Sequence, residues 1–204
     1  MIIKILVMKK YRKLKKEVLG ILNSELPENL YYHGIHHTVD ALNVCDLYIE
    51  EEKIIEEDAY LLKVGVLMHD IGFTVSVENH EILSVEMAVL LMGKYNFDPD
   101  DIEKVKELIM ATQIPQNPIN HLEEIICDVD LDYLGRPDFY VISDQLFNEL
   151  SAYDKIENKL EWNKIQIKFL ESHKFHTDFA RKYRRPQKEK RIVELKGLIK
   201  HNYF

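Results

Sequence analysis

The sequence of 204 residues is poor in the residues that end regular structure, with seven glycines and six prolines. An all-β sandwich needs many tight turns, so this scarcity favours long helices. The two cysteines, Cys45 and Cys127, stand far apart and outside any CxxC pair, which argues against a disulfide framework or a zinc knuckle.

No run reaches the roughly 18 apolar residues of a membrane span. The apolar start MIIKILVM precedes its basic residues, the reverse of a signal peptide. We therefore expect a cytoplasmic protein with no membrane partner.

Net charge and chain length further limit the classes of protein that fit the sequence. The 27 Lys and Arg residues are outnumbered by 35 Asp and Glu, giving a net charge of −8, which does not suit a nucleic-acid binder. The length fits one core better than two domains. We expect a single domain over 1–204, with a core at about 30–135 and a helical extension at about 138–204. The basic tail 181–204 is either a rim that attracts phosphate, together with Lys174, or a solvated amphipathic helix.

Apolar residues recur at helical spacing through most of the chain, while the two prolines of QIPQNP (residues 113–118) mark a loop. We interpret Asp58 as a helix cap, Gly72 as a helix stop and Asp98-Pro99 as a helix start. The pattern predicts an all-α helical bundle. The expected helices cover residues 11–22, 33–52, a segment from 58 to about 70, 81–95, a segment from 98, a segment from about 120, and two or three more from 138 onward.

Histidine and aspartate stand on buried positions of these expected helices. His37 shares the apolar stripe of its helix with Ala41 and Val44, and the pair His69-Asp70 ends the most hydrophobic helix. A lone buried histidine is more often a structural one. An imidazole and a carboxylate at a buried helix end need partners, however, and a divalent metal satisfies both. A third element is the segment CDVDLDYLG, in which the helical period leaves Asp130 and Asp132 as alternatives.

The order of these motifs resembles that of the HD-domain metal-dependent phosphohydrolases. The resemblance runs from about residue 32 to 135, through YHGIHHTVDAL (32–42), LLKVGVLMHDIGF (61–73), NHEILSVEMA (79–88) and DVDLDYLG (128–135). It implies an HD-like bundle. It also implies that His37, His69, Asp70 and Asp130 are the metal ligands, which chooses Asp130 over Asp132.

The resemblance also bears on a second metal. His80, which opens the HExxS segment, matches the first additional ligand of two-metal members of the family. The next such ligand would fall within Ile109–Thr112, where no histidine stands. We therefore expect one divalent ion, with Mn, Fe, Ni, Zn and Mg all left open, or a second ion that is held weakly with waters.

The reaction implied is hydrolysis of a phosphoester or phosphoanhydride of a nucleotide or another small phosphorylated molecule by a metal-activated water. We assign Asp70 and His80 as catalytic residues, the latter for proton transfer. His33 and Arg136 are the expected substrate-binding residues. The alternative is a non-catalytic HD module that binds metal or nucleotide. The oligomeric state stays open, with a homodimer through the later helices as one arrangement.

Overall fold

A computed structural model describes residues 2–201, with side chains from Met8 onward. Within that range the chain forms ten α-helices and two short 3-10 helices, η1 and η2, and no strand, so the prediction of an all-α protein is confirmed. The elements are α1 (Ile2–Glu25), α2 (Ile35–Glu51), α3 (Glu56–Met68), η1 (Ile71–Thr74), α4 (His80–Lys94), α5 (Pro99–Ala111), α6 (His121–Asp130), η2 (Asp132–Gly135), α7 (Phe139–Ala152), α8 (Lys159–Ser172), α9 (Asp178–Tyr183) and α10 (Arg185–Lys200).

The contacts within the chain separate it into two compact units. The first unit comprises Met1–Glu28 and His33–Asp130, and the second comprises Asn29–Tyr32 and Leu131–Phe204. All the elements from α1 to α6 belong to the first unit, and η2 with α7–α10 belongs to the second. Among the described helices, none is both long and apolar enough to cross a bilayer.

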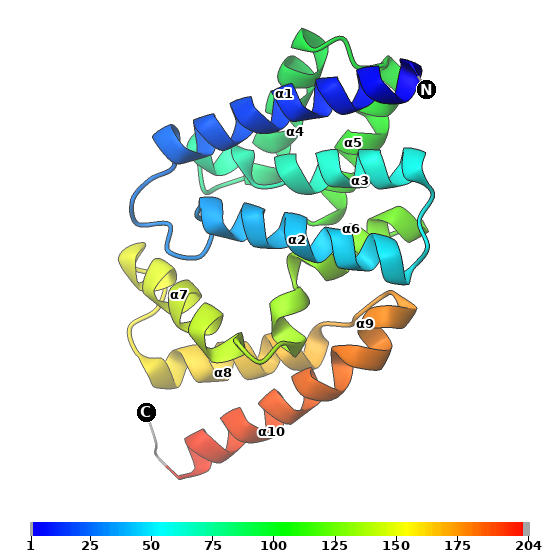
Figure 1. Cartoon of the computed structure of the whole chain (residues 1–204). Helices are drawn as coiled ribbons and strands as arrows, with labels where there is room; N and C mark the ends of the chain where they lie inside the picture. The colour runs from blue at the N-terminus through cyan, green and yellow to red at the C-terminus, as the bar shows by residue number, and fades with distance from the viewer. Residues whose placement is uncertain (1, 202–204) are drawn as a thin grey trace. The chain divides into compact units, whose positions relative to one another are not determined.

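Helix α3 is the central helix of the first unit, and α1, α2, α4, α5 and α6 all pack against it. In Figure 1, α1, α3 and α2 run side by side, with α4 and α5 behind them. The apolar residues of α3 from Leu61 to Met68 are buried, as the LLKVGVLM run predicts. Gly65 permits the close approach of two neighbours: an added Cβ would lie 3.1 Å from Leu108 Cβ in α5 and 3.3 Å from Ile126 Cδ1 in α6.

Of the three predicted helix ends, one is confirmed and two are wrong. Asp98 caps α5 as expected, since its carboxylate accepts the Asp100 N–H at 3.0 Å. The interpretation of Asp58 as a cap is wrong, because Ile55 holds that position and Asp58 lies in the first turn of α3, where its negative charge still suits the helix dipole. The interpretation of Gly72 as a stop is also wrong, since α3 ends at Met68 and Gly72 lies inside η1.

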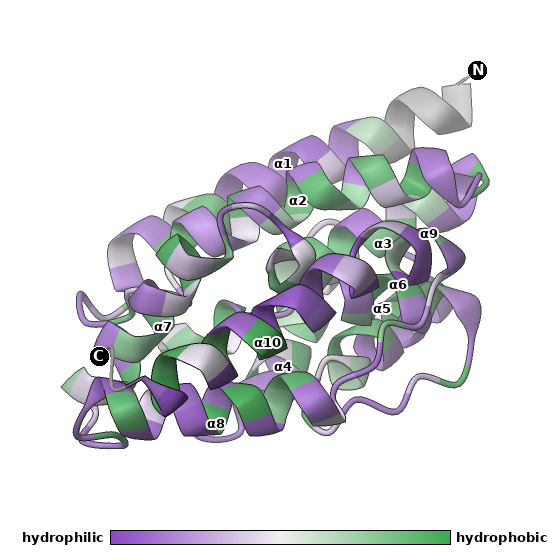
Figure 2. Cartoon of the chain, turned by 90° about the horizontal axis from the view of Figure 1, so that it is seen from below, coloured by the Kyte–Doolittle hydropathy of each residue, from purple (hydrophilic) through white to green (hydrophobic). Residues whose placement is uncertain are grey.

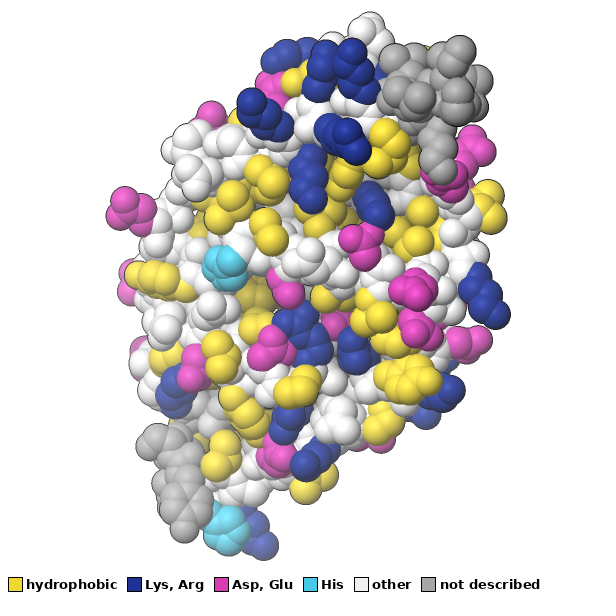
Figure 3. Space-filling model, viewed as in Figure 1, with side chains coloured by type: hydrophobic (Ala, Val, Ile, Leu, Met, Phe, Trp, Pro, Cys, Tyr) yellow, Lys and Arg dark blue, Asp and Glu magenta, His cyan; other side chains and the backbone are white. Residues whose placement is uncertain are grey.

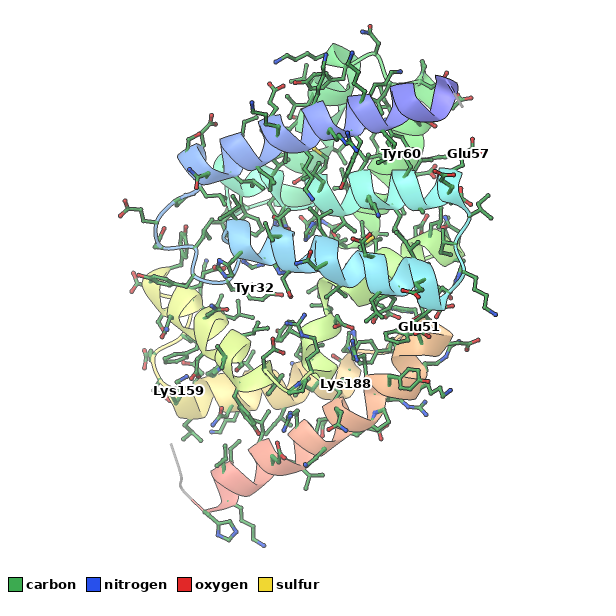
Figure 4. The ribbon with its side chains drawn as sticks, viewed as in Figure 1. Tyr32, Glu51, Glu57, Tyr60, Lys159 and Lys188 are labelled. Atoms are coloured by element: carbon green, nitrogen blue, oxygen red, sulfur yellow. The ribbon has the colours of Figure 1, made fainter. Side chains whose placement is uncertain are left out.

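The second unit is organised by contacts of η2 and α10. Helix α10 packs on α8, α9 and η2, and α7 also contacts η2. Leu195 and Lys188 are the buried side chains of α10, and most of the remaining helix is hydrophilic in Figure 2. Lys188, labelled in Figure 4, donates its Nζ to the His173 carbonyl at 2.5 Å. Within the described residues the basic tail therefore completes α9 and forms the largely hydrophilic helix α10, and its attraction for phosphate stays a prediction.

Candidate metal centre

Three helices of the first unit, α2, α3 and α6, pack against one another and bring four polar side chains together. His37 projects from the first turn of α2 on its buried face. His69 and Asp70 follow directly after the last residue of α3, and Asp130 is the last residue of α6. The side chains of the first three are more than nine-tenths buried, and that of Asp130 is 16% exposed.

The donor atoms of these residues converge on one point. His37 Nε2 lies 3.2 Å from His69 Nε2, 3.1 Å from Asp130 Oδ1 and 3.4 Å from Asp70 Oδ2. His69 Nε2 lies 3.3 Å from Asp70 Oδ2 and 3.4 Å from Asp130 Oδ1. Donors bound to one ion at about 2.1 Å are about 3.0 Å apart at a right angle and about 3.4 Å apart at the tetrahedral angle. The spacing of the His37, His69 and Asp70 atoms therefore fits a divalent cation, and Asp130 Oδ1 lies beside the two imidazole nitrogens of this group.

Asp70 supplies a second test of this fit. Its Oδ2 atom is fully buried and makes no hydrogen bond, although two imidazole nitrogens lie within 3.4 Å of it. A buried carboxylate oxygen without a hydrogen bond is costly, and a cation held between it and the two nitrogens would satisfy all three atoms. His37, His69 and Asp70 form the group in the described part of the chain whose ligand atoms could hold a metal ion.

The backbone of α3 orients His69. Its Nδ1 atom lies 2.8 Å from the Val66 carbonyl oxygen, which can only accept a hydrogen bond. Nδ1 must therefore carry the proton, and the lone pair of neutral His69 is on Nε2, the atom that faces His37 and Asp70. A hydrogen bond from the distal nitrogen to a carbonyl is the usual support of a metal-ligating histidine.

The carboxylates dominate the electrostatics of the cluster. Burial alone would lower the pKa of His69, but Asp70 and Asp130 outweigh it and raise that pKa well above the ordinary value. Burial alone would raise the pKa of Asp70, yet the charge of His69 holds it far below its usual range. The pKa of Asp130 is also lowered against its burial, by hydrogen bonds with His37 and His69. Both carboxylates thus stay ionised and favour a bound cation.

Comparison with known families decides what this arrangement belongs to. Residues 34–132 match the family model described as the HD domain. The chain carries an HD domain. All four converging residues lie inside the matched range. Comparison with curated proteins and with solved structures gives no significant match.

The HD domain holds His80 beside the cluster. His80 begins α4, and its Nε2 atom lies 3.8 Å from Asp70 Oδ1 while Nδ1 lies 3.5 Å from Glu81 Oε2. Its side chain is 21% exposed, and burial lowers its pKa. His80 thus contacts the oxygen of Asp70 that faces away from His37 and His69, and it is not one of the converging donors.

His33 also lies at the edge of the HD domain's cluster. Its ring centroid is 6.1 Å from that of His37, and it stacks on Phe73 at 4.3 Å. His80 stacks on the same Phe73 ring at 4.0 Å. Phe73 thus links the two histidines that the sequence offers for substrate binding and for proton transfer, a role that the sequence analysis missed.

The structure separates the two aspartates that the helical period left open. Asp132 lies in η2 of the second unit, where its buried carboxylate pairs with Arg184 Nε at 2.6 Å. Arg136, the expected substrate anchor, donates to Asp138 at 2.5 Å and lies 3.9 Å from Asp132. Asp130 alone of the pair reaches His37. Binding of substrate by Arg136 stays a prediction.

No histidine occupies the stretch in which a second set of metal ligands would be expected. Thr112, at the end of that stretch, is buried, and its hydroxyl donates to the Ile109 carbonyl at 2.8 Å. A threonine whose hydroxyl is bound to its own helix does not replace an imidazole ligand. The geometry therefore supports one well-built cation site in the HD domain.

Proposed function

We propose that the HD domain is a metal-dependent phosphohydrolase that cleaves a phosphoester or phosphoanhydride bond of a nucleotide or another small phosphorylated molecule. HD-domain proteins are commonly hydrolases of this kind. The observation that carries the proposal is Asp70 Oδ2, which is buried without a hydrogen bond and faces the two imidazole nitrogens of His37 and His69. Such a centre is costly as a purely structural element.

In this proposal His37, His69, Asp70 and Asp130 hold one divalent ion. When bound, the ion lowers the pKa of a water and polarises a phosphoryl oxygen, so that hydrolysis proceeds near neutral pH. On an ion that takes six ligands, four protein donors would leave room for water and substrate. The Val66 carbonyl keeps His69 Nε2 directed at the site, and the other oxygen of Asp70 lies 3.8 Å from His80 Nε2.

His80 is the proposed proton-transfer group. It is the titratable side chain that contacts Asp70 from outside the ligand set, and it is partly exposed. Glu81, beside Nδ1, favours a proton on that nitrogen and leaves Nε2 toward Asp70. In that tautomer His80 can accept a proton at Nε2 and later donate it to the leaving oxygen.

The first experiment is elemental analysis of the purified protein after incubation with Mn²⁺, followed by a screen for phosphate release. Substrates are nucleoside mono-, di- and triphosphates and p-nitrophenyl phosphate, each with Mn²⁺ or Mg²⁺. We expect about one ion per chain and ion-dependent turnover. The variant His69→Ala/Asp70→Ala should lose both.

The matched control is His121→Ala/Glu124→Ala. It removes an exposed imidazole and carboxylate pair of α6, 3.0 Å apart, and should retain metal and turnover. No metal in the unchanged protein, even after incubation with each of the candidate ions, would overturn the proposal.

A non-catalytic metal-binding module is the second candidate. The observation that favours it is Thr112, which stands near the place of a second-metal histidine and is bound to its own helix. Metal content of about one ion per chain without turnover on any substrate of the screen would select this module over the enzyme.

A further inference from the structure

Helix α1 presents four cations on one face. Lys9, Arg12, Lys13 and Lys16 follow the spacing i, i+3, i+4 and i+7, which places them on the same side of the helix. All four are exposed, and in Figure 3 Lys and Arg side chains gather over α1. We call these four residues the cationic stripe.

The stripe has no internal counter-ions. Within the described part of the chain, none of its members forms an ion pair, although twenty-seven cations share the sequence with thirty-five acidic residues. Two other ionic groups of α1 form contacts inside the first unit: Lys10 donates to the Asn96 carbonyl, and Glu17 accepts from Lys94 at 2.6 Å. The stripe is thus left for an external partner.

The opposite face of α1 anchors the helix to the first unit. Leu14, Val18 and Leu22 are buried completely or nearly so. Tyr11 meets the edge of Tyr60, a residue of α3 labelled in Figure 4, with ring centroids 6.1 Å apart. Because this face is occupied, the stripe is held in place on the outside of a folded unit.

The stripe lies in a segment without acidic residues, unlike the basic tail 181–204, which contains Glu189 and Glu194. Residues 2–16 contain seven Lys and Arg and no Asp or Glu, so the remainder of the chain carries −15. Like charges three and four residues apart disfavour a helix. The stripe therefore reduces the stability of α1 unless an anionic partner neutralises it.

The segment that precedes the stripe indicates which partner. Of the residues from Ile2 to Met8, six are apolar and one is Lys4, and they belong to the same helix. A nucleic acid would bind the cations alone, whereas an anionic bilayer surface takes cations at its headgroups and apolar side chains below them. We propose that α1 docks the protein peripherally on a bilayer that contains anionic phospholipid. A peripheral contact needs no membrane-spanning helix. The expectation of no membrane partner was based on the lack of such a helix and does not bear on this contact.

The experiment is cosedimentation of the whole protein with vesicles. Phosphatidylcholine vesicles with and without phosphatidylglycerol are compared at low and at physiological salt. We expect binding that requires phosphatidylglycerol and weakens as salt is added, because exposed charges are screened. The variant Lys9→Gln/Arg12→Gln/Lys13→Gln/Lys16→Gln should bind at least about tenfold more weakly.

A matched control has the same change in net charge elsewhere: Lys104→Gln/Lys155→Gln/Lys164→Gln/Lys174→Gln, at exposed positions without ion pairs in the described range. It should bind vesicles like the unchanged protein, and both variants should keep the same helical circular dichroism. A further variant, Ile5→Ser/Leu6→Ser, should also weaken binding to vesicles.

Three outcomes overturn the proposal. Equal loss in both lysine variants would mean that net charge matters and the stripe does not. No binding to phosphatidylglycerol vesicles at low salt would exclude the bilayer. Binding to an oligonucleotide that is lost in the stripe variant, without binding to vesicles, would assign the stripe to nucleic acid.

Discussion

Gly72 lies directly against the first turn of α4: a Cβ added at Gly72 would fall 2.0 Å from the His80 carbonyl oxygen. The Gly72 N–H also donates to Ser84 Oγ at 2.8 Å, and Ser84 is fully buried. This contact joins the turn that carries Asp70 to the helix that carries His80. The distance between those two side chains therefore depends on the absence of a side chain at residue 72.

We expect Gly72→Ala to lower the free energy of unfolding by about 2–3 kcal/mol or more, since the new methyl group must displace backbone atoms of α4. The control Gly93→Ala lies in the same helix with open space around it, and should raise stability by up to about 1 kcal/mol. Denaturant unfolding of both variants checks this. Equal stability of the two variants would show that α4 is not held against Gly72 in solution.

The two aspartates at the end of the HD domain should respond oppositely. Asp130→Ala should lose bound metal and keep most of its stability, because Asp130 is partly exposed and its proposed role is to hold the ion. Asp132→Ala should keep metal and lose about 3 kcal/mol, because it leaves Arg184 without its buried partner. Elemental analysis and thermal unfolding of the two variants separate the roles. Metal retained by Asp130→Ala would remove that residue from the ligand set.

His80→Ala should reduce turnover by about 10²-fold or more while metal content stays near one ion per chain. The reason is that His80 contacts Asp70 Oδ1 and not the point on which the donors converge. Single-turnover rates with saturating Mn²⁺ are compared with metal content for the variant and the unchanged protein. A variant with an unchanged rate would return His80 to a structural role on Phe73.

Glu17 gives a pH dependence that is independent of the metal centre. Hydrogen bonds from Lys94 and Tyr95 lower the pKa of Glu17 below its usual value of 4.5. A carboxylate with a lowered pKa in the folded state stabilises the protein above its unfolded pKa, and that contribution is lost as pH falls through the folded pKa.

The stability advantage of the unchanged protein over Glu17→Gln should therefore be constant from pH 7 to about 5.5 and shrink below about 4.5. Denaturant midpoints of the two proteins across this range measure it. Glu25→Gln, at an exposed position of α1 without an ion pair in the described range, should show no such dependence. An advantage that grew as pH fell would contradict the assignment.

The helical architecture and the buried positions of His37, His69 and Asp70 were predictable because they depend on local pattern, whereas Asp130 was chosen by the resemblance to HD-domain proteins. The apolar run of α3 fixes that helix as the buried one, and the stripe shared by His37, Ala41 and Val44 fixes which side of α2 faces it. The choice between Asp130 and Asp132 was not local. It depends on Arg184, fifty-two residues away in the sequence, which binds Asp132 in the second unit.

The supporting contacts of the metal centre escaped prediction for a related reason. Every residue has a backbone carbonyl, so residue types alone could not predict that the Val66 carbonyl binds His69. The sequence shows that His80 and Ser84 are one helical turn apart. It does not show that Ser84 binds the backbone of Gly72, because that contact depends on how closely Gly72 approaches α4.

The hydrogen bond from His69 to Val66 has a consequence for tolerance to mutation. Its acceptor is a main-chain oxygen three residues earlier in the chain, so replacement of the Val66 side chain leaves the acceptor in place. The orientation of the His69 ring is therefore set by the backbone at the end of α3. Sequence drift at residue 66 can alter packing without rotating the ligand, and a chain that keeps α3 and residue 69 keeps half of its histidine pair correctly directed.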